Sequence, residues 1–410
     1  MGKTIKNILL FIIIAIGLVG TLIVIDYQSS QNAEHSNPTA ETFKDRIYYD
    51  VSQLLSAGES SQKPEKPNGN TPEQFQFEDN WQQNKLKQTA WIPNWAFRSG
   101  VESLKENPQQ FYSVSPVLYN VNADGTLKDL NPSGLNEMAE ICRDNNIKII
   151  PSIALFDWER LTTVLNDETS YQNHIDAIVS EIETNNWDGI DLDYESIIIE
   201  DKELYLTLLE DLAEILHKDN KMLSVTVVAK WGDNVIYPSL PQTRAVQDWE
   251  IISEYADEIR IMSYDYTYFG SENPGPIAPM YWMMSVYSYA IEKIPKEKIW
   301  MGIHLYSYEW RDANPDLPEE EKIEAIDELP DKASSYVYSR VQEIIEEHEI
   351  TSYHQTGVEE GYAQYDCDEK FVCMIYFQDQ FGILARTNLA KKFGLEGVAY
   401  WKLGGEGDLL

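Results

Sequence analysis

The sequence predicts an α/β fold, namely a (β/α)8 TIM barrel with a small α+β insertion between its seventh and eighth strands. From residue 89 onward, short apolar runs alternate with amphipathic stretches, a pattern typical of repeated β-α units and a parallel sheet. Eight such runs occur, and eight strands close a barrel of this kind. One connection, over residues 307–396, is too long for a simple loop and predicts additional structure.

The expected strands are separated by segments with helical spacing. After the fourth strand, Leu204, Leu208 and Leu212 recur at intervals that place them on one face of a helix. We place the insertion at about 311–377, because this part of the long connection contains an acidic segment, a helical stretch and extended pieces. The expected strands cover residues 89–95, 110–119, 147–155, 189–194, 222–229, 258–264, 299–306 and 397–403.

An uncharged apolar segment over residues 8–25 is preceded by Lys3 and Lys6 and followed by Asp26. This segment is long enough to span a bilayer, and its positive N-terminal flank predicts a cytoplasmic N-terminus. We therefore expect residues 1–25 to be a short cytoplasmic tip and a single-pass signal anchor in the cell membrane, with the barrel outside the cytoplasm. A cleaved signal peptide, which would release the protein, is the alternative.

Residues 26–86 are mostly polar, and the part from Gly58 to Pro72 is rich in Gly, Ser, Pro, Lys and Asn. Such a composition cannot bury enough apolar surface to build a core. The sequence therefore predicts a polar stalk over residues 26–86 and a folded barrel domain over residues 87–410.

The chain of 410 residues has a formal net charge of −36. This charge argues against nucleic acid and anionic membrane surfaces as partners of the exposed part, because binding phosphate requires a basic surface. It favours a self-repelling, monomeric ectodomain with a neutral partner such as carbohydrate. The six His residues lack the spacing of metal ligands, so we expect no metal site and no cofactor.

The chain contains three cysteines, two of which lie close together in the sequence. Cys367 and Cys373 flank residues 368–372, which have the length of a tight hairpin, and a disulfide is possible in an oxidising compartment. Cys142 falls in an amphipathic segment and is expected to be a buried apolar residue.

The most informative segment is Asp188–Glu195, which carries four carboxylates and no Lys or Arg. On a strand, Asp191, Asp193 and Glu195 share one face, whereas Asp188 points to the other face. Like charges this close, in a partly buried place, raise the pKa of at least one carboxyl group towards neutrality. A proton donor beside a second carboxylate is what glycoside hydrolysis requires. A divalent-cation site is the alternative, because hard cations also bind clustered carboxylates.

The ends of two further strands carry residues suited to a sugar site. Active sites in such barrels lie at the C-terminal ends of the strands. The sixth strand ends in Met262, Tyr264 and Asp265, and the eighth ends in Trp401, whose indole can pack against a sugar ring. For Tyr264 and Trp401, ordinary packing within the barrel is the alternative.

The pattern of the four acids resembles the D-x-x-D-x-D-x-E signature of glycoside hydrolase family 18, the chitinase-like barrels. Met262, Tyr264 and Asp265, and Trp401 on the eighth strand, are similar to further marks of that family and follow in the expected order. The resemblance extends over residues 89–410. Several segments look similar to the bacterial branch of spore-germination and cortex-lytic N-acetylglucosaminidases, namely residues 115–119, 124–127, 274–279, 302–310 and 397–404.

The resemblance implies a division of labour among the acids. The substrate's own 2-acetamido carbonyl would be the nucleophile in this family. Glu195 would protonate the leaving glycosidic oxygen and then deprotonate water, which gives retention of configuration. Asp193 would orient the acetamido group, Asp191 would share a proton with Asp193, and Asp188 would have a structural or electrostatic role.

The same resemblance gives roles to the other marked residues. Tyr264 would hydrogen-bond to the acetamido oxygen, Asp265 would help to hold the distorted sugar, and Trp401 would stack beneath it. Met262 would contribute to substrate binding. The sequence departs from the pattern at Ser152–Leu155, which lacks the S-x-G-G of many chitinases. It also departs at His304, Ser307 and Gln378, where Pro, Gly and Glu are expected in this branch.

The sequence therefore predicts a membrane-anchored glycosidase that cleaves β-1,4 bonds after N-acetylglucosamine, in peptidoglycan or in chitin-like oligomers. A carbohydrate-binding protein without hydrolytic activity, built on the same barrel, is the main alternative. Inactive members of the family commonly lose the catalytic Glu, and this chain keeps Glu195.

Overall fold

The computed structural model describes residues 86–410, except residues 234 and 238. The described residues belong to one compact unit of the chain. None of the helices they form is both long and apolar enough to cross a membrane. The expected signal anchor and the polar stalk lie outside the described residues, apart from Leu86.

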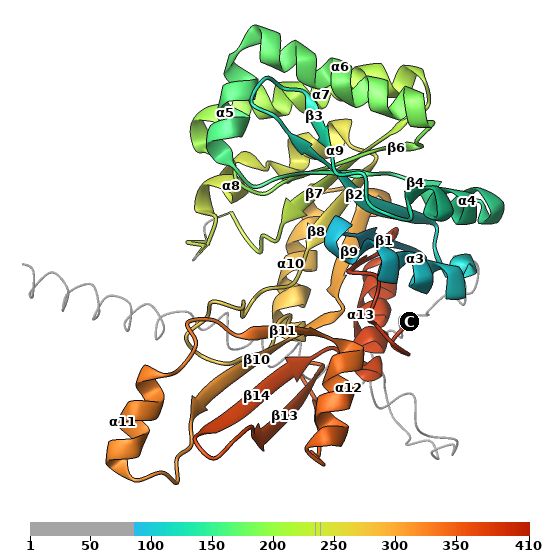
Figure 1. Cartoon of the computed structure of the whole chain (residues 1–410). Helices are drawn as coiled ribbons and strands as arrows, with labels where there is room; N and C mark the ends of the chain where they lie inside the picture. Colours follow the sequence, from blue (N-terminus) through green and yellow to red (C-terminus); the bar gives the residue numbers. More distant parts are fainter. Residues whose placement is uncertain (1–85, 234, 238) are drawn as a thin grey trace, which may run out of the picture. The chain divides into compact units, whose positions relative to one another are not determined.

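Eight parallel strands form a closed barrel, which confirms the predicted fold (Figure 1). The ring closes because β1 pairs in parallel with both β2 and β15. The strands around the barrel are β1 (Lys87–Ile92), β2 (Ser113–Val121), β5 (Ser152–Leu155), β6 (Gly189–Tyr194), β7 (Met222–Val228), β8 (Glu258–Met262), β9 (Ile299–His304) and β15 (Gly397–Trp401). Two short strands, β3 (Leu127–Asp129) and β4 (Lys148–Ile149), also pair with β2.

Proline residues set two strand boundaries that the sequence pattern placed wrongly. β1 ends at Ile92, immediately before Pro93, and does not continue to residue 95. The third expected strand is divided into β4 and β5 at Pro151. Proline has no N–H to donate to a strand ladder, so it interrupts or ends a strand in the middle of a sheet.

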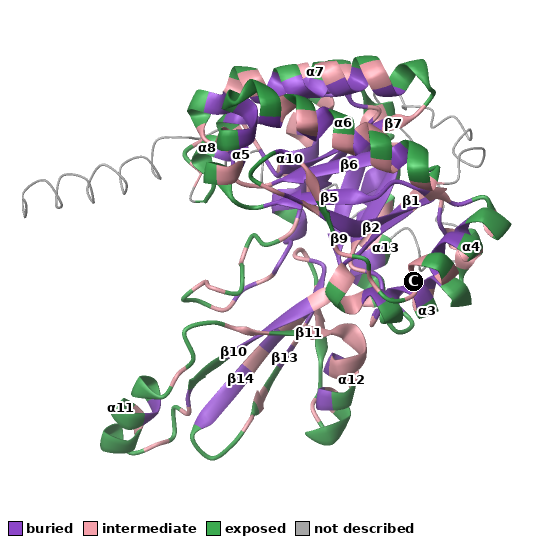
Figure 2. Cartoon of the chain, turned by 45° about the horizontal axis from the view of Figure 1, so that its top comes forward, coloured by how far each residue is buried: buried purple, intermediate pink, exposed green. Residues whose placement is uncertain are grey.

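Helices follow the barrel strands and bury one face against them (Figure 2). In the helix after β6, Leu208 and Leu212 are buried as predicted, whereas Leu204 is half-buried. The helices around the barrel are α3 (Phe97–Glu106), α4 (Leu135–Asn145), α5 (Trp158–Asn166), α6 (Glu168–Asn185), α7 (Lys202–Lys218), α8 (Pro241–Val246), α9 (Trp249–Tyr255), α10 (Met280–Lys293) and α13 (Gln380–Phe393).

Aspartates cap several of these helices. Asp157, Asp167, Asp248 and Asp379 each accept a hydrogen bond from the backbone N–H three residues later, at the start of α5, α6, α9 and α13. Such a cap satisfies one of the backbone donors that a helix start leaves without a partner. Part of the large acidic content of the chain is therefore used to begin helices.

A second sheet, of five strands, lies between β9 and β15 in the sequence. It starts at Tyr306, one residue after β9, and thus earlier than the expected boundary at about residue 311. Val341 of α12 packs against Ala363, Ile375 and Phe377 of this sheet. Its elements are β10 (Tyr306–Ala313), α11 (Glu319–Asp327), β11 (Ser334–Val337), α12 (Tyr338–Glu347), β12 (Tyr353–Gln355), β13 (Glu360–Asp366) and β14 (Phe371–Phe377).

Buried polar contacts join this second sheet to the barrel elements. Glu360 of β13 accepts hydrogen bonds from the backbone N–H groups of Ile277 (2.9 Å) and Ala278 (2.6 Å), which precede α10. Arg386 of α13 donates to the Glu360 carboxylate (3.1 Å) and to the Glu359 carbonyl (2.6 Å). These contacts fix the start of β13 against two barrel helices.

The three cysteines have different environments. Cys367 and Cys373 form a disulfide at the hairpin between β13 and β14. Cys142 is a buried free thiol in α4.

Candidate active site

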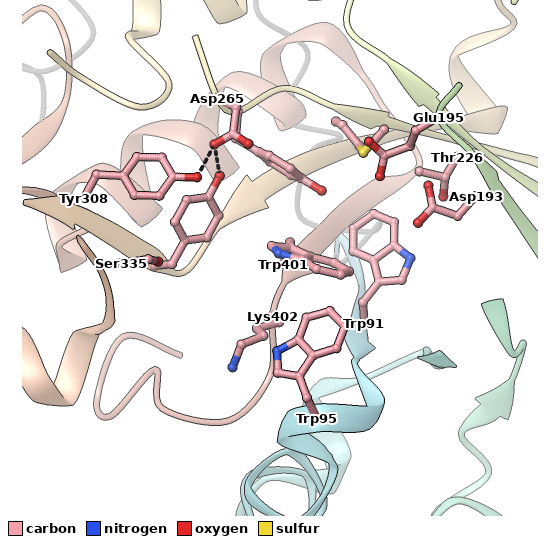
Figure 3. Close-up of a pocket in the computed structure, with 13 residues that line it drawn as sticks. Trp91, Trp95, Asp193, Glu195, Thr226, Asp265, Tyr308, Ser335, Trp401 and Lys402 are labelled. Carbon is pink, nitrogen blue, oxygen red and sulfur yellow. Dashed lines mark hydrogen bonds between the residues drawn. The ribbon is translucent and has the colours of Figure 1, made fainter. Parts of the chain in front are cut away.

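A pocket of about 310 Å³ opens at the C-terminal ends of the barrel strands (Figure 3). It contains the residues predicted for the site at the ends of the sixth and eighth strands. It also contains Asp193 of β6 and Glu195, which follows β6 directly. Its lining residues are Trp91, Trp95, Asp193, Glu195, Thr226, Met262, Tyr264, Asp265, Tyr306, Tyr308, Ser335, Trp401 and Lys402.

The acids of β6 occupy successive layers of the barrel. Asp191 is in register with Ser152 of β5 and Ser224 of β7, and Asp193 is in register with Ala154 and Thr226. Side chains of a strand alternate between its faces, so Asp191 and Asp193 both point into the barrel. Glu195 follows the strand and lies at the rim of the pocket.

Asp191 lies in the barrel interior, below the pocket. Its carboxylate accepts hydrogen bonds from Ser152 (2.6 Å), Ser224 (2.8 Å), Thr226 (3.0 Å) and the Trp91 indole (3.1 Å). The Arg260 guanidinium lies 3.7 Å away. The donors and this cation compensate the burial of a carboxylate, which would otherwise be strongly unfavourable.

Asp193 is nearly fully buried, and its Oδ1 atom has no hydrogen-bond partner among the described residues. Burial raises the pKa of Asp193 well above its usual value, and the charges of Glu195 and Asp191 raise it further. A buried acceptor without a hydrogen-bond partner is energetically unfavourable. The same atom is free to accept a hydrogen bond from a ligand.

Glu195 has a pKa of about 7, because it is largely removed from solvent and because Asp265 adds a repulsive charge. The ordinary value for this group is 4.5. At neutral pH the carboxyl group is therefore divided between its protonated and ionised forms. A general acid that later acts as a base requires such a balance.

Two tyrosines of the second sheet hold Asp265. Tyr306 and Tyr308 of β10 both donate hydrogen bonds to its Oδ1 atom, the latter at 3.0 Å (Figure 3). Burial raises the pKa of Asp265, and these two hydrogen bonds oppose that rise. Tyr264 is half-buried, and desolvation together with the charges of the nearby acids raises the pKa of its hydroxyl group well above the usual value. Tyr264 therefore remains a hydrogen-bond donor at neutral pH.

Three tryptophans form an aromatic side of the pocket. Trp401 packs edge-on against Trp91, with ring centroids 5.9 Å apart, and tilted against Trp95, with centroids 6.2 Å apart. Trp91 is buried, whereas 68% of Trp95 is exposed. Aromatic faces of this kind bind the apolar C–H faces of sugar rings.

Asp188 lies at the other end of β6, away from the pocket. Its carboxylate accepts a hydrogen bond from the backbone N–H of Ile149 in β4 (2.8 Å), and its own N–H donates to the Ile149 carbonyl (2.9 Å). These contacts link β4 to the start of β6, so Asp188 does not take part in the pocket.

Several pocket residues were not predicted from the sequence. Trp91 lies near the end of β1, Trp95 lies in the 3-10 turn that follows it, and Tyr306, Tyr308 and Ser335 belong to the second sheet. Position at the C-terminal end of a barrel strand was a usable signal for the two tryptophans. For Ser335 no signal existed, because its approach to the pocket depends on how β11 pairs with β10.

The pocket's acids are not arranged as a metal centre. Within the described part of the chain, no group of three or more His, Cys, Asp or Glu side chains could hold a metal ion. Asp191 faces hydroxyl groups and a guanidinium, which compete with a cation for the carboxylate oxygens.

The fold and the pocket together define a barrel protein of the glycoside hydrolase class. The chain belongs to glycosyl hydrolases family 18, whose family model matches residues 71–406.

Relatives with a curated description come from Bacillus species. The chain is 26% identical over 293 residues to the cortical fragment-lytic enzyme of Bacillus anthracis, covering 70% of this chain and 63% of that protein. It is 22% identical over 255 residues to the glycosylase YvbX of Bacillus subtilis, covering 62% and 68%. The chain spans between 35% and 68% of the length of such relatives.

Solved structures show the same fold. The spore cortex-lytic enzyme SleL of Bacillus cereus superposes with a TM-score of 0.68 at 21% identity, covering 78% of this chain and 71% of that one. A chitinase of Chromobacterium violaceum superposes equally well, with a TM-score of 0.68 at 19% identity over 79% of this chain and 96% of that one.

Proposed function

We propose that this protein is a retaining, substrate-assisted glycoside hydrolase that cleaves β-1,4 bonds after N-acetylglucosamine, in peptidoglycan or in chitin-like oligomers. The observation that carries the proposal is the pair Asp193 and Glu195, side by side in one pocket with Trp401. Asp193 offers a buried acceptor that has no hydrogen-bond partner among the described residues, and Glu195 has a pKa near neutrality. Family membership and the cortex-lytic relatives add support.

In the proposed reaction Glu195 donates its proton to the glycosidic oxygen as the bond to the sugar breaks. The carbonyl oxygen of the substrate's 2-acetamido group attacks the anomeric carbon and forms a cyclic oxazolinium ion. Glu195, now ionised, then accepts a proton from the water that opens this ring. Its pKa of about 7 suits both steps.

Asp193 and Tyr264 would hold the acetamido group during this attack. The free Oδ1 atom of Asp193 would accept the acetamido N–H, and the Tyr264 hydroxyl would donate to the acetamido oxygen. Asp193, whose pKa is raised, would share its proton with Asp191 and become ionised as the oxazolinium ion forms, so that its charge stabilises this cation in a low-dielectric pocket. Asp191 is held in place for this by its donors below.

We also propose that the barrel works outside the cytoplasm, anchored by the apolar segment at residues 8–25. Fractionation of cells that produce the full chain tests this. The anchor predicts that the protein stays with membranes after a high-pH carbonate wash, and recovery in the culture medium without residues 1–25 would support the cleaved signal peptide.

Incubation of the full-length protein with purified peptidoglycan, and separately with chitin oligomers, tests the activity. The proposal predicts new reducing ends that carry N-acetylglucosamine, identified by mass spectrometry, from at least one substrate. Glu195→Gln is the matched control, because it keeps the size of the side chain and removes the proton to be donated. Binding of either substrate without new reducing ends would support the carbohydrate-binding alternative.

A further inference from the structure

Lys402 is a cation in the pocket that forms no ion pair with any described residue, although the charge of Glu406 opposes the lowering of its pKa by burial. It follows Trp401, lines the pocket and is half-buried. Within the described residues it belongs to no ion pair, and its ammonium group has one long contact, 3.5 Å, with the Gly404 carbonyl. An ammonium group carries three donors, so most of its hydrogen-bonding capacity is unused by those residues.

Three other half-buried or buried lysines among the described residues are held much more closely. Lys221 donates to the Trp187 carbonyl at 2.7 Å, and Lys230 donates to the Gln247 carbonyl at 2.6 Å. Lys298 donates to two carbonyls at 2.8 and 2.9 Å. Lys402 differs from these structural lysines, and it is also the single basic residue among those that line the pocket.

The surroundings of Lys402 suit a charged group of a ligand. In Figure 3, Lys402 and Trp95 lie on one side of Trp401, and the two acids of β6 lie on the other. Burial lowers the pKa of Lys402, which reflects the unfavourable placement of its charge in this pocket. An anion bound there would relieve this cost and satisfy the free donors.

We propose that Lys402 is a specificity-determining residue that binds the carboxylate of a 3-O-carboxyalkyl sugar, as in muramic acid, next to the N-acetylglucosamine unit being cleaved. This inference rests on the proposed function. In a polymer of alternating N-acetylglucosamine and N-acetylmuramic acid, every N-acetylglucosamine has a neighbouring sugar with such a carboxylate. Chitin has no such carboxylate. In a chain of net charge −36, a local cation in the site also offsets the general repulsion of an anionic polymer.

The test compares two oligosaccharides of alternating N-acetylglucosamine and N-acetylmuramic acid without stem peptides. In one the lactyl carboxylates are free, and in the other they are converted to primary amides. The readout is the ratio of kcat/KM for the free acid to kcat/KM for the amide, measured with the full-length protein. This ratio cancels general effects of a substitution on folding or on the chemical step.

The proposal predicts a ratio well above one for the unaltered protein. Lys402→Gln should lower it about tenfold, as expected for the loss of one charged contact worth about 1.4 kcal/mol, and Lys402→Arg should largely preserve it. Added salt should lower the ratio in the unaltered protein. Lys391→Gln, which removes an exposed lysine of α13 outside the pocket, should leave the ratio unchanged and so control for net charge.

A ratio near one in the unaltered protein, or the same ratio in Lys402→Gln, would overturn the inference. Absence of cleavage of both oligosaccharides is a failure of the proposed function instead. In that case binding is measured instead of cleavage. Calorimetry gives the dissociation constants of the free acid and of the amide, for the unaltered protein and for Lys402→Gln. Their ratio in each protein then tests the role of Lys402 in the same way.

Discussion

At the scale of single residues, the acids of β6 share one face but work in different environments. Within the described part of the chain, Asp191 has several donors and Arg260 beside it, one oxygen of Asp193 has no hydrogen-bond partner, and Glu195 lies at the rim of the pocket with a raised pKa. The alternation of a strand was sufficient to predict that the three acids point the same way. The alternation alone could not predict that Arg260 of β8 would lie beside Asp191 and compensate its charge.

The raised pKa of Glu195 predicts the alkaline limb of the pH–rate profile. Glu195 must be protonated to donate its proton, and its pKa is about 7. We therefore expect kcat/KM to fall above about pH 7, tenfold per pH unit once most of Glu195 is ionised. Steady-state rates between pH 5 and pH 9 check this. A kcat/KM that stays constant up to pH 9 would contradict the assignment of Glu195 as the acid.

Tyr306 should affect the pH at which this alkaline limb falls, because it hydrogen-bonds to Asp265. Its hydrogen bond lowers the pKa of Asp265, and ionised Asp265 raises the pKa of Glu195. Tyr306→Phe therefore makes Asp265 more protonated at neutral pH, which lowers the pKa of Glu195 and shifts the fall of kcat/KM to lower pH. Tyr362→Phe, which removes a hydroxyl bonded to Gln364 in β13, is the control and should not shift it. A shift to higher pH in Tyr306→Phe would be evidence against this coupling.

At the scale of elements, the second sheet completes the pocket. β10 begins directly after β9, so Tyr306 and Tyr308 lie beside Asp265, and β11 adds Ser335. The sequence showed that this connection needs its own structure, and β6 has the bounds expected for it. The contribution of the second sheet to the site could not be predicted, because it depends on contacts distant in sequence, such as those of Glu360 with Ile277 and Ala278.

The disulfide should stabilise the hairpin between β13 and β14. If the disulfide acts by lowering the entropy of the unfolded chain, closing so short a loop stabilises the folded hairpin by about 2 kcal/mol. We expect Cys367→Ser together with Cys373→Ser to accelerate amide hydrogen exchange in β13 and β14 more than in β6 of the barrel. Hydrogen exchange followed by mass spectrometry gives this comparison. An equal acceleration in all three strands, or none in the hairpin, would contradict a local role of the disulfide.

At the scale of the whole molecule, burial of acids makes stability depend on pH. Glu195 has a pKa of about 7 in the folded state and an ordinary value of 4.5, so the folded state binds more protons between these pH values. Its stabilising contribution is thus complete below pH 4.5 and is lost as the pH rises through 7. Glu195→Gln resembles the protonated form at every pH.

The free energy of unfolding of Glu195→Gln, relative to that of the unaltered protein, should therefore increase with pH. The expected gain between pH 4.5 and pH 8 is on the order of 3 kcal/mol, since one pKa unit corresponds to about 1.4 kcal/mol. Urea unfolding at several pH values measures the difference. If the difference were independent of pH, the burial of an ionisable Glu195 would not hold in solution.

In the proposed mechanism the substrate's acetamido group is the nucleophile, held by Asp193 while Glu195 supplies the proton. This is tested by kcat/KM for a series of aryl chitobiosides whose reacting acetamido group carries zero, one, two or three fluorine atoms. Fluorine withdraws electrons from the carbonyl oxygen and weakens it as a nucleophile, so we expect kcat/KM to fall steeply along the series. Values that are the same for all four substrates would contradict it.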